Sequence, residues 1–206
     1  MAPTRSTIEI SRLQPTQLTV GMLQVKHKRA HLRLLERRPS ELVDFILAHP
    51  IRVVLGPKKK VFVIDHHHLA LALIKEDFET APMDVEGDFS SLTPQAFWKK
   101  MLEQDFVHPY DAGGHKKSLA YIPKSLENLV DDPYRSLAGF VREKGGYAKV
   151  QTPFAEFLWA DFYRSRIKEK LITKHLSKTL SQAMLLAEHQ DARKLPGFIA
   201  KGTVHE

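Results

Sequence analysis

The amino-acid sequence predicts an α+β protein, in which a small mixed sheet with helices is followed by a helical C-terminal half. Two observations carry this prediction. Short β-branched and apolar runs bounded by turn residues, which are typical of strands, gather before residue 90. After residue 90, three Thr-Pro or Asp-Pro pairs mark helix starts, because each pair joins a good N-cap to a proline that suits the first helical turn.

Sequence patterns in the first half define the predicted sheet and two helices. The expected strands are residues 7–10, 51–55, 61–64 and 82–89. The expected helices are residues 19–38 and 41–48. Gly21 weakens the first turn of the first helix, and Pro39 ends that helix. The segment Gly-Pro-Lys-Lys-Lys between the second and third strands predicts a hairpin.

The second half reads as a series of helices. The expected helix starts are Thr93, Asp132 and Thr152, and the expected last helix is residues 171–189. Gly145-Gly146 is expected to close the second of these helices. Residues 108–121 predict a long loop, and residues 194–206 predict a loose tail.

The change in character near residue 90 predicts two parts. Residues 1–90 would form the α+β core, and residues 91–206 a helical extension packed on it. No segment has the length or composition of a flexible linker, and no internal repeat is present in the sequence.

Composition places the chain among ordinary globular proteins and removes several classes of function. Its 206 residues are 43% hydrophobic and 27% charged, which allows one substantial core. Cysteine is absent from the sequence, so disulfide frameworks and cysteine nucleophiles are excluded. No apolar run approaches the ~18 residues of a membrane span, and the N-terminal residues lack the apolar core of a signal peptide. We therefore expect a cytoplasmic protein with no membrane partner.

The stretch with the clearest chemistry is VFVIDHHHLA at residues 61–70, where a β-branched run meets an acid, three histidines and strong helix formers. This pattern predicts a buried strand that runs into a helix N-terminus. Such a junction presents backbone N–H groups and the positive end of the helix dipole, so it suits a phosphate or another anion.

Two interpretations of these polar residues stay open. Adjacent histidines point in different directions, so all three cannot converge on one metal ion, and we predict no metal site. His67 and His68 either bind phosphate or belong to a solvated helix start. Asp65 either caps the helix, or holds a histidine tautomer or a magnesium ion.

The order of these motifs resembles the ParB/sulfiredoxin fold superfamily and, within it, the ParB-like putative nuclease family. The matching segments are LQPTQLTVG at 13–21, DHHH at 65–68, DDPYRSLA at 131–138 and FAEFLWAD at 154–161. In much of the superfamily the strand-to-helix junction is similar to Asp-Gly-His-His-Arg and binds nucleotide phosphates. Here Asp65, His67 and His68 fit that motif, whereas His66 replaces its glycine and Leu69 its arginine.

The resemblance also implies candidate site residues. Asp65, His67 and His68 would be catalytic, with His66 beside them in the ligand site. Some superfamily members use a glutamate base after the first strand, and Gln17 lies near that position. Because an amide does not accept a proton as a carboxylate does, Gln17 would instead orient a hydroxyl or a phosphate.

A second set of candidate ligands lies in the helical half. Arg135 and Arg142 are seven residues apart and therefore share one helical face. Arginine suits bidentate contacts with phosphate, so this face could form the other wall of a nucleotide cleft. The alternative is surface ion pairing beside an aspartate cap at Asp132.

These patterns favour a protein that binds a nucleotide (ATP, ADP or CTP) or a phosphorylated small molecule, with magnesium as a candidate cofactor. Phosphotransferase or nuclease chemistry at the same site is the enzymatic form of this prediction. The alternative is a non-enzymatic DNA-binding or partition-type module. The net charge of +7 and the basic runs at 26–38 and 58–60 favour that class, although the first run is also typical of a solvated helix face.

Overall fold

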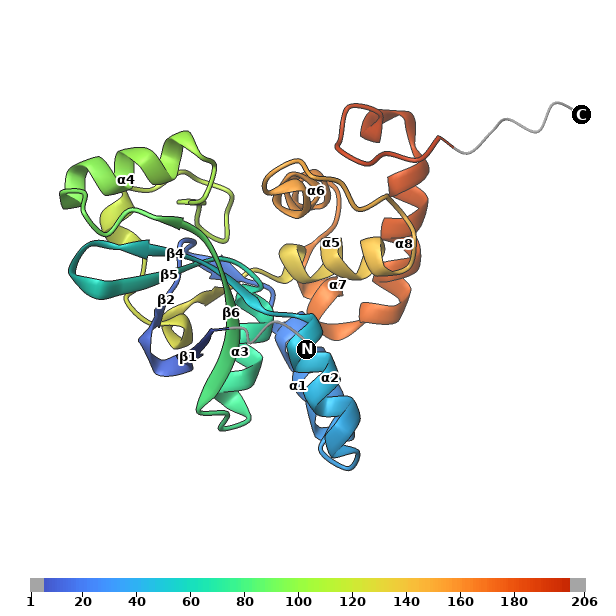
Figure 1. Cartoon of the computed structure of the whole chain (residues 1–206). Coiled ribbons are helices and arrows are strands. Elements are labelled where there is room, and N and C mark those ends of the chain that lie inside the picture. Colours follow the sequence, from blue (N-terminus) through green and yellow to red (C-terminus); the bar gives the residue numbers. More distant parts are fainter. Residues whose placement is uncertain (1–5, 201–206) are drawn as a thin grey trace, which may run out of the picture. The chain divides into compact units, whose positions relative to one another are not determined.

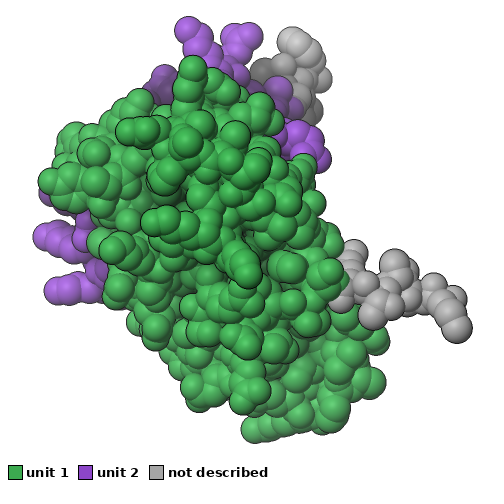
Figure 2. Space-filling model, turned by 60° about the vertical axis from the view of Figure 1, so that its left-hand side comes forward, with its two compact units in different colours: residues 1–131 green, residues 132–206 purple. Residues whose placement is uncertain are grey.

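The computed structural model describes residues 6–200. The chain divides into two compact units, Met1–Asp131 and Asp132–Glu206, which Figure 2 distinguishes by colour. The predicted α+β class is confirmed, because the first unit holds a mixed sheet with helices and the described part of the second is helical. The predicted domain boundary near residue 90 marks where strands give way to helices, and as a domain boundary it stays a prediction.

The sheet of the first unit has five strands in the order β1-β6-β4-β5-β2 (Figure 1). They are β1 (Thr7–Glu9), β2 (Leu13–Gln14), β4 (Ile51–Gly56), β5 (Lys60–Asp65) and β6 (Thr80–Asp88). Strands β4 and β5 form the predicted antiparallel hairpin. Strand β6 pairs parallel with β4, β2 pairs parallel with β5, and β1 pairs antiparallel with β6. The four predicted strands are therefore confirmed to within two residues.

Side-chain alternation along β5 gives the sheet two different faces. Val61 and Val63 are buried with the apolar faces of α1 (Met22–Leu35) and α3 (His67–Lys75), whereas Phe62 is buried with Phe97 and Met101 of α4 (Pro94–Glu103). The helices of this unit are α1 (Met22–Leu35), α2 (Pro39–Ala48), α3 (His67–Lys75) and α4 (Pro94–Glu103). The sheet thus separates the core on the α1 and α3 side from a smaller core under α4 (Figure 1).

The basic run in α1 is a solvated helix face. Its apolar positions, Val25, Leu32 and Leu35, are buried. Arg29 and Arg33 both form ion pairs with Glu76 at the end of α3. These ion pairs leave fewer charges of the basic run available to bind a polyanion.

The first predicted helix began too early and ended too late. Thr19–Val20 is strand β3, which pairs parallel with β7 (Val130–Asp131). Gly21 is the N-cap of α1, and the Met22 N–H donates to Asp131 Oδ1 at 2.8 Å. Helix α1 ends at Leu35, and Pro39 opens α2 at its first position. A strand partner 111 residues away in the sequence therefore overrides the helical pattern over 19–20.

The described part of the second unit contains α5 (Pro133–Glu143), α6 (Ala155–Arg164), α7 (Glu169–Lys174) and α8 (Leu176–Glu188). Asp132 caps α5 as predicted, because its Oδ1 accepts from the Tyr134 and Arg135 N–H groups. Thr93 caps α4 in the same way through its hydroxyl. The Gly146 N–H donates to Val141 O and closes α5, which confirms the predicted helix end.

Three predictions for this half were wrong. Helix α6 starts after Phe154, which takes a left-handed conformation with φ 56°, and not at Thr152. The predicted helix 171–189 is two helices that meet at His175. Residues 194–200 are not a loose tail, because Phe198 pairs with Tyr147 in a β-bridge. Residues 201–206 of that predicted tail lie outside the described residues.

The remaining connections are short single turns or loops. Single 3-10 turns occur at Ile10–Arg12, Pro57–Lys59, Leu119–Tyr121, Leu126–Asn128 and Gln190–Ala192. The predicted long loop at 108–121 is largely irregular, and bridges from His108 to Gln17 and from Tyr110 to Lys116 hold it. Within residues 6–200, no helix combines the length and apolar character that crossing a membrane requires.

Candidate functional site

The predicted strand-to-helix junction is present, and its backbone has an unusual conformation. Strand β5 ends at Asp65, α3 begins at His67, and His66 between them is the N-cap with φ 68° and ψ 25°. This left-handed conformation favours glycine and costs most other residues about 1 kcal/mol. It explains why similar junctions carry glycine here, and it shows that His66 takes the place of that glycine.

The His66 side chain points away from the other two histidines. Its half-buried ring donates through Nδ1 to Pro50 O at 2.8 Å, and it lies 6.3 Å from the ring of His49. Burial lowers the pKa of His66, although the Asp65 carboxylate and the Pro50 carbonyl act in the opposite direction. His66 is therefore directed toward the start of β4.

His67 and His68 are buried, and each accepts a hydrogen bond from the chain that follows β2. The Nε2 atom of His67 accepts from the Thr16 N–H at 3.3 Å, and that of His68 accepts from the Gly21 N–H at 3.1 Å. In both cases Nε2 must carry a lone pair, so the ring is neutral with its proton on Nδ1. The two histidines of α3 thus hold both ends of segment 16–21.

That segment contributes further buried polar groups. The Thr16 hydroxyl donates to Val63 O at 2.7 Å, and the Gln17 amide donates to Thr19 O at 2.7 Å. The Thr19 hydroxyl is buried with no hydrogen-bond partner among the described residues. Within residues 6–131, the polar residues that are buried as whole residues lie on this segment or on the first turns of the two helices beside it. They are Thr16, Gln17, Thr19, Gln24, His67 and His68.

Asp65 does not cap the helix. Its Oδ1 accepts from the N–H of the adjacent His66 at 2.7 Å, and its side chain is 56% exposed. Partial desolvation raises the pKa of Asp65, but the His66 ring, the His66 backbone N–H and Arg52 together lower it further, so the pKa lies below its ordinary value. Asp65 is therefore a carboxylate at neutral pH, and the nearest guanidinium atom, Arg52 Nη1, is 3.9 Å away.

The N-terminus of α3 keeps its positive end uncompensated by its own residues. No side chain of the described residues caps α3, and no acid lies in its first turn. Buried polar groups therefore surround a positive helix end, which is the arrangement that favours an anion. Within residues 6–200, no group of three His, Asp or Glu side chains could hold a metal ion, which agrees with the predicted lack of a metal site but does not test it.

Arg135 and Arg142, which were predicted to form one wall of a nucleotide cleft, lie in the second unit and both approach the carboxylate of Glu156. Arg142 forms an ion pair with Glu156, and Arg135 Nη2 lies 3.9 Å from the same carboxylate. Arg135 also lies over the ring of Phe157, 5.2 Å from its centroid. These are the ion pairs of the alternative interpretation, and a phosphate-binding role for Arg135 and Arg142 stays a prediction.

Sequence reasoning missed several residues that complete these groups. Thr19 and Gly21 lie inside the segment LQPTQLTVG, but nothing in the sequence indicates that the Gly21 backbone meets His68. Arg164 is the half-buried partner of the buried Asp132, with Nη2 2.7 Å from its Oδ2. The pairing joins positions 32 apart, so no local pattern could reveal it.

Comparisons with known proteins support the assignment of the fold. The chain matches the family model described as "Putative ParB-like nuclease" over residues 6–165. It is similar to the crystal structure of protein Atu1540 from Agrobacterium tumefaciens, with 42% sequence identity and a TM-score of 0.86. That similarity covers 97% of this chain and 100% of the other. No curated protein matches the chain.

Proposed function

This chain belongs to the ParB-like putative nuclease family, and we propose that it binds a phosphoester, as a nucleotide or a phosphodiester, at the N-terminal end of α3. One observation carries the proposal: the polar residues of 6–131 that are buried as whole residues gather beside one uncapped helix N-terminus. Burial of polar groups is costly, so a fold that concentrates them in one place has a reason to do so. We also assign the chain to the cytoplasm.

The backbone supplies the primary contacts in this proposal. The first N–H groups of α3 and the helix dipole favour the phosphate oxygens. His67 and His68 support the site indirectly. Their Nε2 atoms accept hydrogen bonds from the backbone of segment 16–21 and hold that segment in place. A magnesium ion would enter with the nucleotide phosphates and meet the carboxylate of Asp65.

Catalysis, where it occurs, would depend on Asp65. Its lowered pKa makes it a weak proton acceptor, and it is better suited to bind a cation or orient a water molecule. The Gln17 side-chain amide donates a hydrogen bond to Thr19 O, and Gln17 has no carboxylate to act as a base. We therefore propose phosphoester binding as the main function, with phosphoryl transfer or hydrolysis as a second step at Asp65.

Calorimetric titration with ATP, ADP, CTP and GTP, with and without magnesium, tests the proposal. His67→Gln and His68→Gln are the informative variants, because the glutamine Oε1 can replace Nε2 as an acceptor but has no titratable proton. We expect each variant to fold and to bind a nucleotide about tenfold more weakly than wild type, because the flexible glutamine side chain holds segment 16–21 less firmly than the imidazole does. Absence of heat with every nucleotide at millimolar concentration would remove the proposal.

A specific observation also supports a DNA-binding module as the second candidate. Lys58, Lys59 and Lys60 are exposed at the tip of the β4–β5 hairpin, and none of them forms an ion pair within residues 6–200. A gel shift with duplex DNA at rising salt distinguishes this candidate, because a protein that contacts phosphates loses affinity steeply as salt rises. No shift even at low salt would exclude it.

A further inference from the structure

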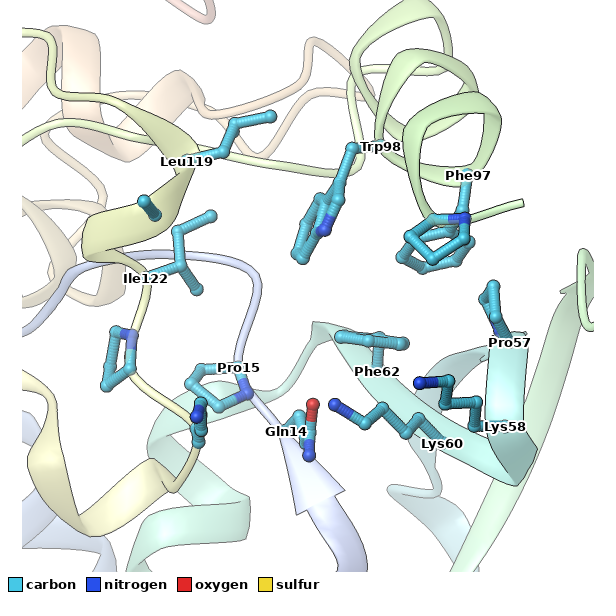
Figure 3. A pocket seen from close by; sticks show the side chains of 14 residues that line it. Gln14, Pro15, Pro57, Lys58, Lys60, Phe62, Phe97, Trp98, Leu119 and Ile122 are labelled. Atoms are coloured by element: carbon cyan, nitrogen blue, oxygen red, sulfur yellow. The ribbon is translucent and has the colours of Figure 1, made fainter. Parts of the chain in front are cut away.

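A pocket of about 280 Å³ lies on the α4 side of the sheet, opposite the face that packs on α1 and α3 (Figure 3). Aromatic rings form its floor and one wall, and lysines form part of its rim. The principal lining residues are Phe62, Phe97, Trp98, Leu119 and Ile122, with Lys58, Lys60 and Lys124 at the edge. Neither the family resemblance nor the predicted site includes this pocket.

The strand register explains how these residues come together. Residues two apart on a strand share a face, so Lys60 lies on the same side as Phe62. Gln14 of β2 pairs with Phe62 of β5 and lines the same pocket. Gly56 pairs with Lys60, and a Cβ at Gly56 would lie 2.5 Å from the Phe62 ring, so glycine leaves room for that ring. The strand register and the glycine at position 56 therefore determine the shape of the pocket.

The aromatic rings are arranged to receive a flat group. The Phe62 ring packs against Phe97 at 4.7 Å between centroids, and Trp98 meets Phe62 edge-on at 5.4 Å. Phe62 and Phe97 are buried, whereas Trp98 is half-buried and so retains accessible ring surface. In Figure 3, Trp98 and Leu119 face the space from one side, and Lys58 and Lys60 come from the hairpin on the other.

The rim carries an uncompensated positive charge. Lys58, Lys60 and Lys124 are exposed, and none of them has an ion-pair partner within residues 6–200. No acid is present among the described residues that line the pocket. Lys58 and Lys59 also take left-handed conformations, with φ 58° and 56°, which cost energy and turn the hairpin tip sharply. Both charge and shape therefore favour an anionic ligand with an aromatic part.

We propose that this pocket accepts one unpaired base of a single-stranded nucleic acid, while the three lysines bind the flanking phosphates. The volume is below the ~300 to 1,000 Å³ of typical drug-sized sites, so it suits a single ring system. Stacking on aromatic side chains together with a positive rim is the usual way in which proteins hold single strands. A duplex does not place a base in this pocket, because its bases are inside the stack. The proposal does not depend on the phosphoester site at α3.

The tryptophan in the pocket provides a direct measurement. Sequence-wide, tryptophan occurs at Trp98 and Trp159, and Trp159 is fully buried in the other unit. We expect an oligothymidylate of about ten residues to quench the wild-type emission and Trp98→Phe to abolish that quenching. An abasic strand of equal length, which keeps the phosphates but has no bases, should cause no quenching.

Binding by fluorescence anisotropy of a labelled oligothymidylate separates base from charge. Trp98→Ala should weaken binding about tenfold, because one stacked base is lost. The Lys58→Gln, Lys60→Gln, Lys124→Gln triple variant should lower the slope of log affinity against log salt by about two. The matched control replaces the exposed Lys170, Lys178 and Lys194 of the other unit by glutamine and should change neither quantity.

Several results would overturn the assignment. If the abasic strand or polyglutamate binds as tightly as oligothymidylate, the lysines act as a nonspecific anion surface or a peptide site. If thymidine monophosphate binds as tightly as the strand, the ligand is a free nucleotide and not a single strand. Trp98→Ala, which lies outside the α3 site, should leave the calorimetric binding of ATP unchanged, so failure of the phosphoester proposal and failure of this one give different results.

Discussion

The start of α3 and the pocket under α4 lie on opposite faces of one sheet. The histidine side chains of the first have hydrogen-bond partners within the protein, whereas the charged side chains of the second have no ion-pair partner among the described residues. At the start of α3, buried histidines are hydrogen-bonded to the Thr16 and Gly21 backbone. In the pocket, exposed lysines surround aromatic rings and have no ion-pair partner among the described residues. Segment 13–16 serves both, since Gln14 and Pro15 line the pocket and Thr16 contacts His67.

This difference separates residues that stabilise the fold from residues that are available to bind a ligand. A buried polar group with a protein partner contributes to folding, and its loss leaves the partner unsatisfied. An exposed charge without a protein partner contributes little to folding and is free to act on a ligand. Variants on the two faces should therefore differ in stability and in binding.

The largest expected effect is the loss of folding stability in His67→Ala and His68→Ala. Each substitution leaves a buried backbone N–H without an acceptor and opens a cavity, so we expect the free energy of unfolding to fall by about 2 to 4 kcal/mol. Urea denaturation followed by circular dichroism measures it. His68→Gln, which restores an acceptor, should recover most of the loss. If His68→Ala is as stable as wild type, the hydrogen bond of His68 does not contribute to folding stability.

The pocket should behave differently. Trp98 is only half-buried, so Trp98→Ala should cost about 1 to 2 kcal/mol in the free energy of unfolding. The same substitution should weaken oligothymidylate binding about tenfold. Comparison of denaturation midpoints with anisotropy titrations of the same preparations checks both values. A stability loss as large as that of His68→Ala would place Trp98 in the core and weaken the contrast between the two faces.

The sequence predicts elements whose signals are local. The hairpin at 51–64 and the Thr93 and Asp132 caps depend on residues within a few positions of each other, and they are confirmed. Asp65 to His68 was placed correctly at a strand-to-helix junction for the same reason.

The errors arise where a distant segment decides the structure. Residues 19–20 are strand and not helix because residues 130–131 pair with them. The directions of His67 and His68 depend on where segment 16–21 passes. The pocket joins four segments, around residues 14, 60, 98 and 122, and no local pattern links them.

The lysine rim should carry the smallest stability effect of the pocket variants. Lys58, Lys60 and Lys124 are exposed, so their replacement by glutamine should cause no measurable loss of folding stability. Removal of three like charges could even relieve repulsion. Thermal denaturation at low and high salt measures this effect. A clear loss of stability would show that the rim has protein partners, and the contrast with the α3 junction would then fail.

The last prediction concerns His66, which belongs to the junction but faces away from segment 16–21. At about pH 8, His66→Gly should change stability little, because relief of the left-handed strain, about 1 kcal/mol, offsets the lost hydrogen bond to Pro50, about 1 kcal/mol. Nucleotide binding should be nearly unchanged as well, because the side chain does not reach the start of the helix. His67→Gln, measured in parallel, is the positive control for weakened binding.

The pH dependence of His66 gives a sharper form of this test. Burial lowers the pKa of His66, so the unfolded chain binds a proton more readily than the folded chain. The stability contribution is therefore complete above the ordinary histidine pKa, about 6.5, and is lost as the pH falls through the lower folded value. Asp65 faces the ring and opposes this shift, whereas His49 and Lys28 add to it. His66→Asn accepts the left-handed conformation and does not titrate, so it should lose less stability than wild type between about pH 8 and about pH 5.5. Equal losses in the two proteins would show that His66 does not titrate differently on folding.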